Sequence, residues 1–214
     1  MKKRIISISI LIFLLSCGPY VWFKQPQPQG KADLKSFPEK LLGKYISVTD
    51  SSVIRIDSFK IVKEYRENLL MTKDEFKEET GDTIPADTSF IFATNWNISI
   101  HSFNDSIELF SSCDDVLFSI SERNILKEYK GYYFLNLKDT NNYWQVNILR
   151  LEKDTLEFDD ILTEKDIKNI KNRITVEVLT DSSEQKQYIL NPSKRQIRKI
   201  LKTRSSGEKF VRSL

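Results

Sequence analysis

The chain has 214 residues, an ordinary length for one domain or two small ones, and its 40% hydrophobic and 29% charged residues are typical of a globular protein. One histidine and two cysteines exclude a zinc site built from thiolates and imidazoles, and a scaffold held by several disulfides. The net charge of +3 comes from Lys2, Lys3 and Arg4, so residues 17–214 carry 30 basic and 30 acidic side chains and give no support to nucleic-acid binding through overall charge.

The N-terminal segment has the pattern of a secretory signal peptide. Basic residues precede the apolar run Ile5 to Leu15, and a small residue, Ser16, stands before Cys17. The stretch Leu14-Leu15-Ser16-Cys17 resembles the lipobox of bacterial lipoproteins. This resemblance covers only the first residues. It implies that residues 1–16 are removed, that Cys17 carries the lipid (acyl chains such as palmitate), and, since Gly18 is not Asp, that the protein resides in the outer membrane.

A membrane-spanning anchor is the alternative interpretation of the same segment. No charged residue occurs from Ile5 to Phe23, a stretch of 19 residues, and about 20 are needed for a helix to cross a bilayer. Gly18-Pro19 would interrupt such a helix, which favours the lipoprotein over an inner-membrane signal anchor with a periplasmic domain. Either way we expect export to the cell envelope, because basic residues before an apolar segment stay in the cytoplasm.

The composition after Cys17 predicts a tether followed by one domain. Gln25 to Gly30 contains two prolines, which restrict the backbone and favour an extended spacer. Residues 17–36 are therefore expected to form a lipid-anchored tether, and residues 37–214 a single β-rich domain.

Alternating apolar and polar residues predict strands at 53–56, 96–100 and 144–148, and a hairpin from 174–178 and 187–190. Helices are expected after Thr163, as an N-cap with Asp166 at the third helical position, and from Asn191-Pro192, with a helical turn at 71–76. The predicted fold class is mainly β, an antiparallel barrel or sandwich, with one or two short helices toward the C-terminus.

Two stretches of the chain recur. Residues 54–65 resemble residues 118–129 at an offset of 64, and Trp96 to Ile100 resembles Trp144 to Ile148 at an offset of 48. Residues 105–109 resemble residues 154–158 at an offset of 49, one residue more than the offset between the two tryptophan stretches. We therefore predict a duplicated β meander, about 50–110 and 114–162, with an insertion at 72–87 in the first copy.

Residues that carry chemistry are few, and none forms a recognisable catalytic motif. His101 lies on the polar side of a predicted strand, and Cys113 precedes Asp114-Asp115, whose charge opposes a thiolate. The pairs Asp114-Asp115 and Asp159-Asp160 lie where turns are expected. No phosphate-binding loop, dinucleotide motif, metal-ligand spacing or nucleophile motif is present, so no catalytic residue, cofactor or metal is assigned.

The C-terminal segment is strongly basic. Residues 192–214 contain eight basic residues and one acidic residue. One interpretation is that the predicted helix presents a surface to an anionic partner. The residues of this surface would be Lys194, Arg195, Arg198, Lys199, Lys202 and Arg204. The other is that the segment packs on the acidic remainder of its own domain.

These patterns together favour a non-enzymatic binding or assembly module, held in the membrane by a lipid anchor and contacting an envelope protein or an anionic partner. A lipocalin-like carrier of an apolar ligand is the first alternative, since small barrels are either filled by side chains or hold one ligand. A hydrolase is the second, and it lacks a catalytic constellation in the sequence.

Overall fold

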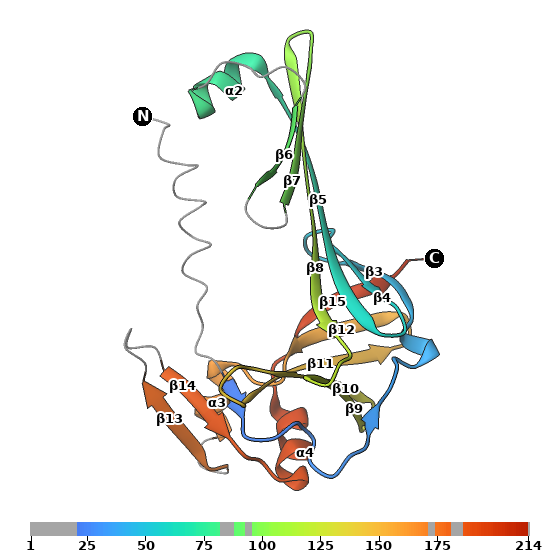
Figure 1. Ribbon diagram of the computed structural model, residues 1–214, viewed down its shortest axis with the longest axis vertical. Helices are drawn as coiled ribbons and strands as arrows, with labels where there is room; N and C mark the ends of the chain where they lie inside the picture. The colour runs from blue at the N-terminus through green and yellow to red at the C-terminus, as the bar shows by residue number, and fades with distance from the viewer. Residues whose placement is uncertain (1–20, 82–87, 93–95, 171–173, 181–185, 214) are drawn as a thin grey trace. The chain divides into compact units, whose positions relative to one another are not determined.

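The computed structural model describes residues 21–81, 88–92, 96–170, 174–180 and 186–213, and these are mainly β (Figure 1). The strands are β1 (Val21–Phe23), β2 (Asp33–Leu34), β3 (Gly43–Ser47), β4 (Val53–Ile56), β5 (Lys60–Thr72), β6 (Thr88–Phe92), β7 (Trp96–Phe103), β8 (Ser106–Ser119), β9 (Asn124–Tyr129), β10 (Tyr132–Lys138), β11 (Trp144–Glu152), β12 (Thr155–Asp160), β13 (Val176–Thr180), β14 (Lys186–Leu190) and β15 (Glu208–Arg212). The helices are the 3-10 helix η1 (Glu39–Leu41) and the α-helices α2 (Lys73–Thr80), α3 (Glu164–Ile170) and α4 (Lys194–Thr203). The predicted fold class is confirmed.

The described chain divides into two compact units. Residues 64–115 form the first, and residues 21–63 with 116–213 form the second, so β5 and β8 contribute to both. In the second unit the strand order is β13-β14-β1-β11-β12-β15-β3-β4-β5, and β10, β9 and β2 extend the sheet from the other edge of β11. The neighbouring strands of this unit pair antiparallel, except that β1 pairs parallel with β14. The sheet is not closed.

The sheet of the second unit curls around a core of large side chains. Residues of β3, β4, β9, β11 and β15 meet in one cluster, although β4 and β9 lie far apart in the strand order. Tyr45, Phe118, Tyr133 and Phe210 fill this interior, each less than 2% exposed. Burial of aromatic side chains of this size contributes much of the free energy of folding.

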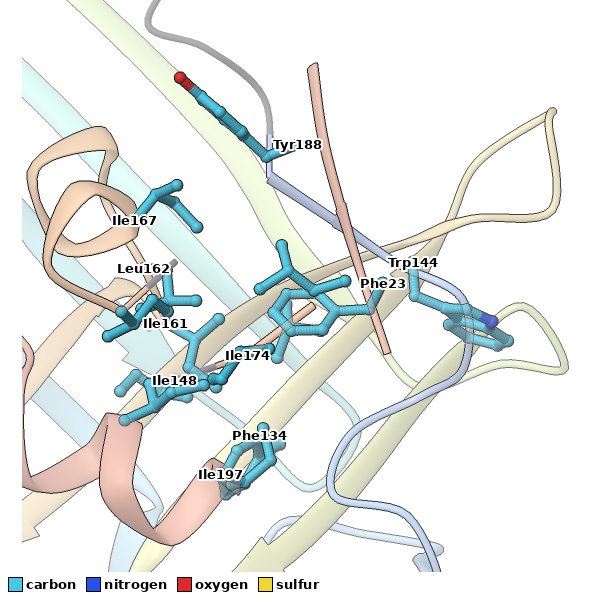
Figure 2. Close-up of a cluster of buried hydrophobic side chains, with 14 residues drawn as sticks. Phe23, Phe134, Trp144, Ile148, Ile161, Leu162, Ile167, Ile174, Tyr188 and Ile197 are labelled. Carbon is cyan, nitrogen blue, oxygen red and sulfur yellow. The ribbon is translucent and has the colours of Figure 1, made fainter. Parts of the chain in front are cut away.

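A second core lies on the opposite face of β11. Alternate residues of this strand point to opposite faces, so Trp144, Val146 and Ile148 enter this second cluster while Leu149 enters the first. Helices α3 and α4 cover the cluster with Ile167, Ile170, Ile197 and Ile200. Figure 2 shows the Phe23 ring among these side chains, with Ile197 against Phe134.

The segment expected to be a tether belongs to the fold. β1 pairs with β14 and β11, and Phe23 is completely buried. The side chain of Asn136 donates to the carbonyl of Gln27 and accepts from its backbone N–H, which fixes this proline-rich segment. For the described residues 21–36, the tether prediction and the domain boundary at 37 are therefore wrong. The prolines shape a packed connection between β1 and β2 instead of an extended spacer.

The first unit is a smaller sheet that carries one helix. Its strands follow the order β5-β8-β7-β6, and Phe76 of α2 packs with Ile100 and Ile107. Thr72 caps α2 by accepting from the backbone N–H of Glu75, whose side chain accepts in return from the N–H of Thr72. The helical turn predicted for the insertion is thus a full helix with a capping box.

The other helix predictions differ in detail. Thr163 and Asp166 form the expected cap of α3. For α4 the prediction of proline at the first helical position is wrong, because Ser193 is the N-cap and the helix begins at Lys194. Ser193 accepts from the N–H of Gln196, and Gln196 accepts from the N–H of Ser193. Pro192 instead precedes this capping box.

The hairpin registers correct one part of the predicted duplication. β7 pairs with β8 from Phe103 and Ser106, and β11 pairs with β12 from Glu152 and Thr155, each around a two-residue turn. Aligning these turns gives an offset of 49 for both strands. With this offset Trp96 corresponds to Gln145, so the predicted correspondence of Trp96 with Trp144 is wrong by one residue. A shift of one residue along a strand places a side chain on the opposite face of the sheet. The correspondence of 105–109 with 154–158 keeps its offset, and the duplication itself stays a prediction.

Candidate functional site

The exposed face of α4 is the candidate site, and its basic side chains come from one short helix. Ile197 and Ile200 are buried at 0% and 1% exposure and hold the helix against the core. Five side chains on the remaining surface are exposed, and we call them the basic face: Lys194, Arg195, Arg198, Lys199 and Lys202. The helix thus docks through Ile197 and Ile200 and presents its cations to solvent.

The basic face lacks internal charge compensation. Helix α4 contains no acidic residue, and among the described residues none of Arg195, Arg198, Lys199 and Lys202 forms an ion pair. Like charges at i and i+4 destabilise a helix by about 0.2–0.5 kcal/mol per pair, and the spacing of the basic face creates several such pairs. Lys194 and Arg195 also lie in the first turn, where the helix dipole opposes positive charge. The stability of the helix therefore does not explain why so many basic residues lie together on it.

Arg204 does not belong to the basic face. Its side chain is only 5% exposed, and it donates to Glu157 at 2.7 Å and to Asp159 at 2.8 Å, both on β12. The prediction that places Arg204 on a partner surface is thus wrong. The alternative interpretation, that the basic segment packs on acidic residues of its own domain, holds for this residue.

The loop after α4 completes this ion-pair cluster. The backbone N–H of Gly207 donates to Glu157, and a Cβ at position 207 would lie 2.3 Å from the Cβ of Asp159, so only glycine fits there. Burial raises the pKa of Asp159 and opposes the effect of Arg204. In Glu157 burial also opposes the charge, but the hydrogen bonds from Gly207 and Arg204 prevail and lower the pKa.

The structure adds one lysine near the basic face that the sequence did not indicate. Lys31 and Lys194 both lie over the ring of Tyr129, at 5.7 and 5.5 Å from its centroid. The side chain of Gln29 donates to Asn191 just before α4, which holds this N-terminal segment beside the helix. Because Lys194 lies 163 positions after Lys31 in the chain, no local pattern in the sequence could reveal this proximity.

The other residues considered in the sequence lie elsewhere. His101 is exposed on β7 and lies opposite Glu108 of β8. Cys113 is buried, and burial together with Asp115 and Asp114 raises the pKa of its thiol. Asp114 pairs with Arg66, and Asp160 accepts from Asn147, so neither aspartate pair forms an open dyad. In the described part of the chain no group of three or more His, Cys, Asp or Glu side chains could hold a metal ion.

Cys17 and the rest of the lipobox lie outside the described residues. Among those described, no helix has the length and apolarity to span a membrane. Comparison with known proteins found no family model, no curated protein and no solved structure that matches this chain.

Proposed function

We propose that this protein is an exported, lipid-anchored module of the cell envelope that binds an anionic partner through the basic face of α4, without catalysing a reaction. The carrying observation is the exposed, uncompensated charge of that helix. The repulsion between these cations destabilises the helix. Contact with an anionic surface would compensate for this repulsion and would explain why the cations lie on one face.

The position of β1 supports the lipid anchor over a membrane-spanning helix. Val21 to Phe23 form a strand between β14 and β11, so these residues are not available to a helix that crosses the bilayer. The uncharged stretch that precedes Val21 begins at Ile5 and has 16 residues, fewer than the roughly 20 that a spanning helix needs. A signal peptide cleaved before Cys17 accommodates this length.

The filled core of the second unit favours a surface binder over a carrier. A lipocalin-like carrier needs an apolar cavity inside its sheet, and the interior of the curled sheet is occupied by Tyr45, Phe118, Tyr133 and Phe210. The positions that would line the cavity of such a barrel are occupied here by side chains of the core.

We expect lipidation to depend on Cys17. Labelled palmitate should enter the wild-type protein in growing bacterial cells, and Cys17→Ser should abolish the label and release the protein from the membrane fraction. Cys113→Ser should keep both, because Cys113 is buried inside the folded domain. Label that persists in the Cys17→Ser protein would contradict the anchor.

We expect Arg198→Glu to weaken binding without destabilising the fold. The substitution replaces two repulsive contacts, with Lys194 and Lys202 one turn away on either side, by attractive ones, so the free energy of unfolding should stay equal or rise by about 0.5–1 kcal/mol. Retention of residues 18–214 on immobilised heparin, used as a polyanion probe, should fall to a clearly lower salt concentration, and partners crosslinked in intact cells should be lost.

Lys44→Glu is the matched control, since Lys44 is an exposed lysine on β3 of the same unit. It changes the net charge by the same amount. Equal losses of heparin retention in the two variants would show that only net charge matters and would refute a specific basic face.

A further inference from the structure

We infer that the edge strand β13 rests on the bilayer that holds the lipid anchor, with Val178 and Leu179 as the contacting side chains. This inference depends on the proposed lipidation at Cys17. It adds an orientation, because one defined edge of the second unit is then held against the membrane surface.

The length of the connection to the anchor is the first argument. Only three residues, 18–20, separate Cys17 from Val21, the first residue of β1. An extended chain spans at most about 3.3–3.6 Å per residue, so the Cα atoms of Cys17 and Val21 are no more than about 14 Å apart. With the acyl chains of Cys17 in the membrane, Val21 lies within that distance of the headgroup region.

The strand order places β13 inside the same range. Val21 pairs with Tyr188 of β14, and Tyr188 pairs with Val178 of β13. Neighbouring strands are about 4.8 Å apart, so Val178 lies about 10 Å from Val21 across the sheet. Figure 1 shows β13 on the outer side of β14, where among the described strands it has no further neighbour.

The side chains of β13 fit contact with a bilayer. Val178 is 52% exposed and Leu179 is 42% exposed, although both are strongly apolar. They point to opposite faces of the sheet and flank the free edge of β13, so both reach the bilayer when that edge faces it. The one charged residue of the strand, Glu177, pairs with Lys24 at 2.8 Å, which neutralises its charge. An exposed apolar edge of this kind is a liability in water and gains free energy in the interfacial region of a membrane.

A bilayer suits this edge better than a second copy of the chain. Stable protein interfaces bury about 1,200–2,000 Å² in total, and a strand of five residues supplies only a small part of such an area. The anchor supplies the remaining binding energy for a membrane contact, since it holds β13 at the surface and leaves only a local contact to form.

The test uses the full acylated chain with Cys113→Ala as background and a fluorescent NBD label on Val178→Cys. The protein is reconstituted into phosphatidylethanolamine–phosphatidylglycerol vesicles that contain doxyl-labelled lipid. Val48→Cys is the matched control, because Val48 is an apolar residue that is 60% exposed and follows β3, beyond β12 and β15 in the strand order. We expect blue-shifted emission and at least twofold stronger quenching at position 178. A flexible insert of about 12 residues after Gly18 should reduce quenching there to the control value.

The outcomes separate this inference from the proposed function. A protein that is acylated and floats with the vesicles, but is quenched equally at positions 178 and 48, overturns the membrane contact and leaves the anchor intact. A protein without the acyl mass that does not float overturns the anchor, and the contact of β13 fails with it.

Discussion

Phe23→Ala should lower the free energy of unfolding by about 3–5 kcal/mol, as large-to-small substitutions of buried aromatic residues do. The ring is completely buried among side chains of β11, β14 and α4. Alanine would leave a cavity between the sheet and the helices, and the rigid strands around it limit its collapse. Urea denaturation of residues 18–214, followed by circular dichroism, measures the change.

Lys24→Ala is the control for this prediction. Lys24 is the next residue in the chain, and its ammonium pairs with Glu177 while both side chains remain about half exposed. Exposed ion pairs are screened by water and contribute little to stability, so a small effect is expected. If both variants were as stable as the wild type, the N-terminal segment would be a tether after all.

Arg204→Met should lower the free energy of unfolding by about 3 kcal/mol at pH 7, because removal of one partner from a buried ion pair leaves the other charges uncompensated. Glu157 and Asp159 retain 17% and 23% side-chain exposure, so water relieves part of this penalty. Lys202→Met is the matched control, since Lys202 is an exposed cation two residues earlier, and a change below about 0.5 kcal/mol is expected there.

The loss in Arg204→Met should shrink as the pH falls from 7 to 4. In the wild type the pKa of Glu157 is lowered, so its contribution to stability is present at neutral pH and is lost as the pH falls through its folded pKa. The pKa of Asp159 is raised, so its protonation at lower pH favours the folded state. Without Arg204 the pKa of Glu157 should rise and that of Asp159 should rise further, because both lose the arginine that lowers them, and protonation then relieves the buried charges. An equal deficit at both pH values would show that the arginine acts through packing alone.

Much of the fold follows from local patterns that the structure confirms. β4 has the predicted bounds, and the hairpin of β13 and β14 forms where alternation indicates strands. The cap of α3 by Thr163 and Asp166 follows from residue spacing alone. Such features are readable because strand alternation and helix capping involve neighbours in the chain.

The N-terminal segment shows where local patterns fail. Two prolines and several glutamines are typical of a spacer, yet Gln27 is completely buried and bonded to Asn136. Its partner lies 109 residues further along the chain. The composition of this segment shows only that it cannot form a helix or a central strand by itself. It contains no information about a distant residue that hydrogen-bonds its polar groups.

The sequence by itself determined the β class, the cap of α3 by Thr163 and Asp166, and a basic helix near the C-terminus. Only the tertiary structure decided which basic residues face solvent: Arg204 turns inward to Glu157 and Asp159, while Lys31 joins Lys194 over Tyr129. The physical reason is the range of the interactions. Periodicity and capping act within a few residues, whereas burial of a charge depends on the strands and loops that the fold brings around it.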